Sequence, residues 1–169
     1  DYYIDIENKI KNKEEIIDRE LFYFLDCVVT CTRDKIYDEE HPNFEYKCDL
    51  AQSIICYYLD DIGVENYPYS TNKTFGKNVM GHSFIIAKFK VNDRLVNYLI
   101  DPTYIQFFKN EDCSENNYFL IKGVYVKTPS PGYFVSKDII GENRFKRIIE
   151  FRDNGFDVFD EELAKIYGD

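Results

Sequence analysis

The chain has 169 residues, 44% of them hydrophobic, which suits one well-packed domain and is short for two. A net charge of −10, from 21 basic and 31 acidic residues, repels nucleic-acid phosphates and anionic membranes. These values predict no nucleic-acid partner, and they are compatible with a protein or peptide substrate, including a cationic one.

No signal-peptide pattern or long apolar run occurs in the sequence. We therefore expect a soluble protein without membrane insertion, either cytoplasmic or delivered as an effector. Because the chain starts at Asp1 without Met, we also expect a processed product or a fragment of a larger protein.

The first predicted element is a helix from Lys13 to Lys35, followed by a solvated acidic loop at Tyr37–Glu40. Cys27 and Cys31 are four residues apart in this helix, which predicts that both belong to its buried face.

A second helix is predicted with Cys48 in or just before its first turn. Its apolar residues recur at helical spacing, and Gly63 follows the last of them as a stop signal; they are Ala51, Ile55, Tyr58 and Leu59. A thiol at a helix start faces unpaired N–H groups and the positive end of the helix dipole, both of which favour the nucleophilic thiolate.

A polar segment from Glu65 to Met80 follows. It has two interpretations, a lid that borders a cleft and an ordinary surface loop. Two apolar strands, 82–89 and 95–100, are then predicted to form a hairpin, because Asn92-Asp93 suits the centre of a tight turn.

If Asn92-Asp93 is the loop, Asp101 faces Phe84, which shares a face with His82. Asp101 then lies diagonally from His82 on one face, with roughly 7 Å between their Cα atoms. A register shift of one residue would place the two side chains on opposite faces.

Three further elements are expected towards the C-terminus. They are a strand at 118–126, a helix at 142–152 after the turn-rich segment 128–132, and a short last helix capped by Asp160. The whole chain is thus predicted to be one α+β domain with helices on an antiparallel sheet.

Cys48, His82 and Asp101 together form a candidate Cys-His-Asp catalytic triad. His82 would take the thiol proton and return one to the leaving group, while Asp101 would fix the imidazole tautomer. The alternative is that the three are incidental, since a Cys is more often a small buried hydrophobe, and His or Asp a cap or surface residue.

Three stretches resemble the transglutaminase-like branch of the papain-like superfamily: residues 48–63, Gly81-His82-Ser83-Phe84, and 99–104, which reads Leu-Ile-Asp-Pro-Thr-Tyr. The continuation 105–108, Ile-Gln-Phe-Phe, is more similar still to papain-like deamidase domains of bacterial toxins and effectors.

This resemblance implies a papain-like/transglutaminase-like core over 44–108, in which the nucleophile helix packs on an antiparallel sheet. The core lies between an N-terminal helical segment, 1–43, and a C-terminal region of strand and helices, 109–169. The reaction implied is hydrolysis or transfer at an amide bond through a thioester on Cys48.

The sequence departs from two members of this superfamily. Papain-type proteases have a Gln shortly upstream of the nucleophile as an oxyanion donor, and residues 41–47 contain none. Cross-linking transglutaminases are larger and use a Trp, which this chain lacks. The remaining oxyanion candidates are the Cys48 N–H and a donor from Asn43 or Tyr46.

Deamidation of a protein glutamine by an effector or toxin-like enzyme is therefore the favoured function. The alternatives are a cysteine peptidase or transglutaminase-type acyltransferase of the same fold, and a non-catalytic binding module. No cofactor is expected. A zinc site from Cys27, Cys31, His41 and Cys48 is disfavoured because its spacing matches no common finger.

Overall fold

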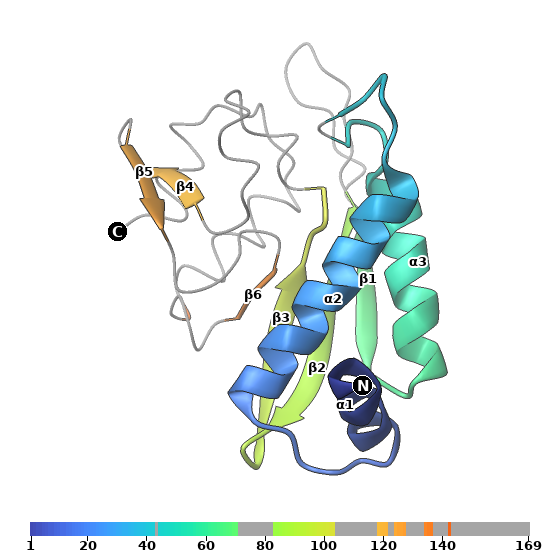
Figure 1. Cartoon of the computed structure of the whole chain (residues 1–169), viewed down its shortest axis with the longest axis vertical. Helices are drawn as coiled ribbons and strands as arrows, with labels where there is room; N and C mark the ends of the chain where they lie inside the picture. Colours follow the sequence, from blue (N-terminus) through green and yellow to red (C-terminus); the bar gives the residue numbers. More distant parts are fainter. Residues whose placement is uncertain are drawn as a thin grey trace.

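The computed structural model describes residues 1–42, 44–70, 83–103, 118–121, 124–127, 134–136 and 142. They form an α+β fold in which helices lie against an antiparallel sheet, as predicted (Figure 1). The helices are α1 (Tyr2–Lys11), α2 (Asp18–Ile36) and α3 (Cys48–Asp61). The strands are β1 (Asn66–Ser70), β2 (Ser83–Val91), β3 (Arg94–Ile100), β4 (Tyr118–Ile121), β5 (Val124–Lys127) and β6 (Phe134–Ser136).

The predicted helix from Lys13 to Lys35 is observed as α2, but it begins later, at Asp18, and it is preceded by a separate helix, α1, that the sequence interpretation did not include. α1 ends at Lys11, and Lys13 has a φ of 59°, a left-handed conformation that interrupts a helix. Ile16 then forms a parallel bridge with Val91 of β2, and α2 begins only at Asp18. The apolar spacing alone did not reveal the later start of α2, because residues 12–17 contain no Gly or Pro.

α3 begins at Cys48 and ends at Asp61, as the apolar spacing predicted. Ala51, Ile55 and Leu59 form its buried face. Gly63 follows the helix with a φ of 77°, a conformation that glycine adopts at little cost.

The main sheet has the strand order β1-β2-β3-β6, and every neighbouring pair is antiparallel. Asn92 and Asp93 turn the chain between β2 and β3 with φ values of 49° and 62°, as a type I′ turn requires. The register runs from Val91 opposite Arg94 to Ile85 opposite Ile100. Both the turn and this register confirm the predicted hairpin.

The sheet has two edge strands that the sequence interpretation did not include. β1 lies in the segment expected to be a loop or lid, and it carries Pro68, which is tolerated at a sheet edge because it has no N–H to donate. β6 forms the other edge beside β3.

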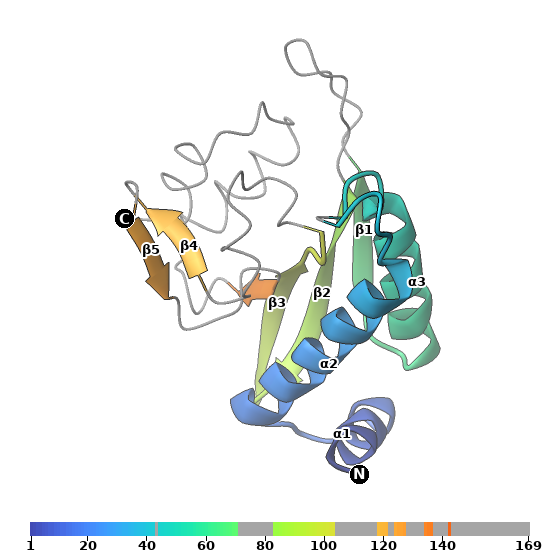
Figure 2. The ribbon, with the colours of Figure 1, turned by 45° about the horizontal axis from the view of Figure 1, so that its top comes forward.

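The core lies between the helices and the sheet. The centroid of the Phe24 ring in α2 is 6.2 Å from the ring centroid of Tyr58 in α3 and 6.3 Å from that of Phe89 in β2. Figure 2 shows α2 crossing the sheet with α3 beside it.

The predicted strand at 118–126 is instead two short antiparallel strands, β4 and β5, on either side of Lys122-Gly123. The predicted helix at 142–152 lies outside the described residues except for Glu142, and Asp160 and the turn at 128–132 lie outside them entirely.

Candidate functional site

Cys48 is the first residue of α3, and it is a free, partly buried cysteine. The residue before it, Lys47, has no side-chain acceptor with which to cap the helix. The first hydrogen bond of the helix runs from the Ala51 N–H to the Lys47 carbonyl, at 3.0 Å. The N–H groups that precede Ala51 in the helix are therefore not used within it, and they lie beside the thiol.

The first turn of α3 is attached to the start of β2 by side-chain hydrogen bonds. The Ser83 hydroxyl donates to Asp49 Oδ1, and Gln52 Nε2 donates to the Phe84 carbonyl at 2.8 Å and the Tyr69 carbonyl at 2.6 Å. Tyr69 and Phe84 are opposite each other in β1 and β2. Gln52 thus joins the helix to both strands one turn after Cys48.

Asp101 directly follows β3, and its side chain is fully buried. Pro102 and Thr103 are also buried. Burying a carboxylate in this way is costly unless hydrogen bonds or a cation compensate it. A buried Asp after a strand therefore favours a specific role over a solvated turn.

The predicted contact between His82 and Asp101 stays a prediction, because His82 lies outside the described residues. The confirmed register ends one residue before Asp101 on β3, at Ile100 opposite Ile85. Continued by one pair, it places Asp101 opposite Phe84, the relation from which the triad was inferred.

The oxyanion candidates are described only in part. Asn43 lies outside the described residues. Tyr46 has a φ of 67° and a side chain that is 75% exposed, with its ring 5.2 Å from that of His41. The Cys48 N–H remains a candidate because it lies at the helix start.

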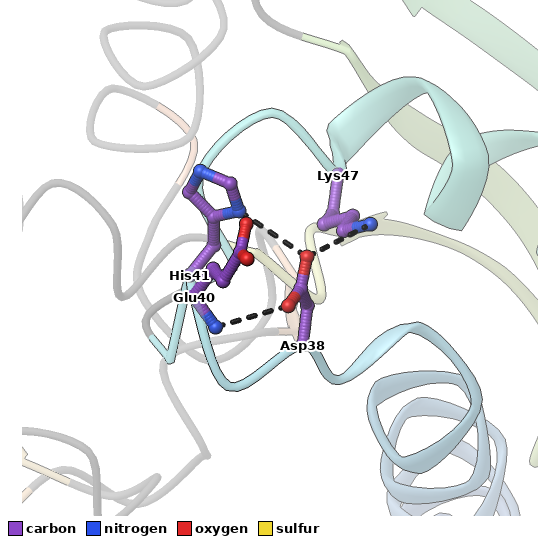
Figure 3. A network of polar contacts seen from close by, with 4 residues as sticks. All are labelled: Asp38, Glu40, His41 and Lys47. Atoms are coloured by element: carbon purple, nitrogen blue, oxygen red, sulfur yellow. Dashed lines mark hydrogen bonds and ion pairs between the residues drawn. The ribbon is translucent and has the colours of Figure 1, made fainter.

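The loop that leads to Cys48 contains an imidazole–carboxylate pair, Asp38 and His41, which the sequence interpretation missed (Figure 3). Asp38 Oδ2 lies 3.3 Å from His41 Nδ1 and 3.7 Å from Lys47 Nζ, and Asp38 Oδ1 accepts the Glu40 N–H at 3.0 Å. The Glu40 N–H and then His41 lower the pKa of Asp38.

Three groups of this loop bind Asp38, while Tyr37, Glu39 and Glu40 are exposed, as predicted for a solvated acidic stretch. The sequence feature that could have predicted this pair is the spacing Asp-x-x-His at Asp38 and His41. His41 lies in the segment that leads to Cys48 and is therefore an alternative to His82 as a candidate base.

Cys27 and Cys56 differ from Cys48 because they lie inside helices and not at a helix start. Burial raises the pKa of Cys27, and burial followed by the nearby Asp60 raises that of Cys56 to about 11. Cys31 is exposed, so its predicted place on the buried face of α2 was wrong. Cys31 lies outside the buried face of α2, which includes Val28, Val29 and Thr32.

The disfavoured zinc site does not form among the described residues. There, a group of three potential metal ligands occurs at Asp38, Glu40 and His41, whose ligand atoms lie within 4.8 Å of one another, and no three of Cys27, Cys31, His41 and Cys48 converge.

Comparisons with protein-family models, curated proteins and solved structures found no match to this chain. Within the described residues, none of the helices has the length and apolar character needed to cross a membrane.

Proposed function

We propose that this protein is a cysteine-dependent acyl-transfer enzyme with a papain-like/transglutaminase-like core, and that it hydrolyses the side-chain amide of a glutamine in a protein substrate. The hydrogen bond from Ser83 to Asp49 is the main support. Cys48 and His82 directly precede these two residues, so a contact between Asp49 and Ser83 favours proximity of the two backbone positions that carry the thiol and the imidazole.

Two further observations support a triad. The position of Cys48 at the start of α3 offers N–H donors for a developing oxyanion. The burial of Asp101 at the end of β3 suits a carboxylate that orients a histidine, because a buried carboxylate binds an imidazolium without competition from water.

In the proposed reaction, His82 takes the proton of the Cys48 thiol, and the thiolate attacks the amide carbon of glutamine. A C–S bond forms, the carbonyl oxygen becomes an oxyanion, and first-turn N–H groups of α3 stabilise it. The C–N bond then breaks, and the imidazolium returns its proton to the leaving ammonia. Water, activated by His82, cleaves the thioester, giving glutamate and the free thiol.

Three features of the sequence favour the side-chain amide over other acyl groups. The segment after Asp101 resembles that of deamidase domains, no Gln precedes Cys48 as in papain-type proteases, and no Trp is present as in cross-linking enzymes. Hydrolysis of a side-chain amide is compatible with both the missing upstream Gln and the missing Trp.

The test is incubation of the chain with a panel of glutamine-containing proteins, with ammonia assayed in solution and peptides analysed by mass spectrometry. We expect ammonia release and a gain of about one dalton on a glutamine, both lost in Cys48→Ala. Cys31→Ala is the matched control, because it removes an exposed thiol from another helix.

Other products would identify the alternatives. New peptide termini would indicate a peptidase, and incorporation of an added primary amine would indicate a transglutaminase-type acyltransferase. Absence of any product, with no thioester on Cys48 after acid quenching, would favour the non-catalytic binding module.

A further inference from the structure

A second site lies at the other end of α3 from Cys48. It is a cavity of about 270 Å³ between the end of α1, the residues that follow α3 and the turn end of β2. Its apolar lining includes Ile10, Val64, Phe89 and Leu95. Since α3 has 14 residues, the cavity is roughly 20 Å from Cys48.

The cavity lies at an interruption in hydrogen bonding along the edge of β2. On one side, the Lys88 N–H donates to the Glu65 carbonyl at 2.9 Å, and on the other the Asn92 N–H donates to the Ile16 carbonyl at 3.1 Å. Lys90 lies between these two bonds.

Because backbone groups alternate along an antiparallel strand, the N–H and C=O of Lys90 face this same edge. The parallel bridge between Ile16 and Val91 pairs the Lys90 C=O with the Ile16 N–H, whereas no backbone acceptor in the described part of the chain takes the Lys90 N–H there. A ligand in the cavity therefore meets one backbone donor beside an apolar wall.

The charge around the cavity differs in sign from that of the whole chain. Three lysines and two glutamates line it, Lys13, Lys88, Lys90, Glu14 and Glu65, so the local sum is 3 − 2 = +1 against −10 for the chain. Glu65 is paired with Lys88, at 3.8 Å between carboxylate oxygen and Nζ.

Lys13 is held at the wall of the cavity. Its Nζ donates to the Gly63 carbonyl at 2.7 Å. An ammonium group has three donors, so two remain after this bond. The Lys13 ammonium and the Lys90 N–H can thus both donate to an acceptor inside the cavity.

We propose that this cavity binds a carboxylate carried on a short branched apolar group. The carboxylate accepts from Lys13 Nζ and the Lys90 N–H, and the apolar group packs against Phe89, Val64 and Leu95. The volume suits a ligand of small size. The same chemistry occurs in a free aliphatic acid and at the C-terminus of a peptide that ends in an apolar residue.

The experiment is a titration of the isotope-labelled full chain, followed through its amide NMR spectrum, with isocaproate, N-acetyl-leucine and the neutral isocaproamide. We expect the Lys90 amide to shift with at least one of the acids, and isocaproamide to bind at least about tenfold more weakly. Preference for isocaproate would identify a free acid as the ligand class, and preference for N-acetyl-leucine a chain terminus.

One variant localises the effect. Lys13→Gln should weaken the binding of the acid and leave that of isocaproamide unchanged, while Lys35→Gln, which changes an exposed lysine in the last turn of α2, should have no effect. The proposal is overturned if neither acid shifts the Lys90 amide at about 10 mM, or if isocaproamide binds as tightly as the acid.

Discussion

Cys48 differs from the other described cysteines in its position along a helix. It is the first residue of α3, whereas Cys56 lies two turns further along the same helix and Cys27 lies within α2. A helix start offers a thiolate N–H donors and a favourable dipole, while burial inside a helix bundle disfavours the charged form.

Alkylation should therefore distinguish these thiols. With limiting iodoacetamide near neutral pH, we expect Cys48 to be modified well before Cys27 and Cys56, whose pKa values are raised by burial. Peptide mass spectrometry in a Cys31→Ser, Cys113→Ser background would measure the order. If Cys27 or Cys56 reacted first, Cys48 would not be the nucleophile.

The identity of the base can be tested with a matched pair of histidine variants. His82→Ala should abolish turnover, whereas His41→Ala should leave most of it, because His41 is expected only to support the loop through Asp38. Asp101→Asn should lower turnover by roughly 10⁴-fold if it acts through the tautomer of His82.

Circular dichroism of all three variants separates loss of chemistry from loss of folding. The reverse result for the two histidines would assign the base to the pair formed by Asp38 and His41. Unfolding of Asp101→Asn would instead indicate a structural role for that carboxylate.

The attachment of α3 to β1 and β2 determines where the thiol lies. Gln52 makes two hydrogen bonds to backbone carbonyls that face each other across the two strands. Because it is one turn from Cys48, a shift of the helix at this point moves the thiol relative to the strand that follows His82.

Gln52→Glu should test this attachment, because an ionised carboxylate cannot donate and would face two carbonyl oxygens. We expect a loss of about 2–3 kcal/mol in the free energy of unfolding, measured in urea, together with slower alkylation of Cys48. The control is Ser53→Glu, which adds the same charge at the next, exposed position. Equal stability of the two variants would show that the Gln52 contacts do not hold the helix.

Polar contacts join α1 to the other two helices. Lys9 of α1 binds Glu20 at the start of α2 at 2.8 Å, and the same carboxylate accepts the Ile17 N–H at 3.1 Å. The Tyr58 hydroxyl of α3 donates to Glu7 of α1. These contacts hold α1 against α2 and α3, although the residues around Lys13 are not helical and separate α1 from α2.

The contacts of Glu20 predict a pH dependence of stability. Lys9 and then the Ile17 N–H lower the pKa of Glu20 below the usual 4.5, in spite of its burial. A folded-state pKa below the unfolded one stabilises the protein above about pH 4.5, and this stabilisation is lost as the pH falls through the folded-state value.

Glu20→Gln should therefore lower the free energy of unfolding at neutral pH by about 1–3 kcal/mol, and the difference from the unmodified chain should shrink below about pH 4.5. Urea titrations over this range measure the effect, with the exposed Glu39→Gln as the control. A difference that stayed constant down to about pH 3 would contradict the assigned role of Glu20.

Several features of this protein followed from the sequence alone, because they depend on local chemistry. The start of α3 at Cys48, the glycine after its end, the turn at Asn92-Asp93 and the register that it fixes are all of this kind. Each is set by side-chain periodicity or by a backbone conformation that few residues adopt. The α+β class followed from the same pattern.

Other features were decided only by the tertiary structure. The interruption at Lys13 between α1 and α2 accompanies the pairing of Ile16 with Val91, about 75 residues away. β1 forms where β2 offers an edge to a segment whose alternation, Tyr67 and Tyr69, is short and contains Pro68. The pair of Asp38 and His41 and the attachment by Gln52 likewise depend on how the chain folds back. The local sequence around these residues does not predict such contacts. The contacts form only when the chain folds back and brings the residues together.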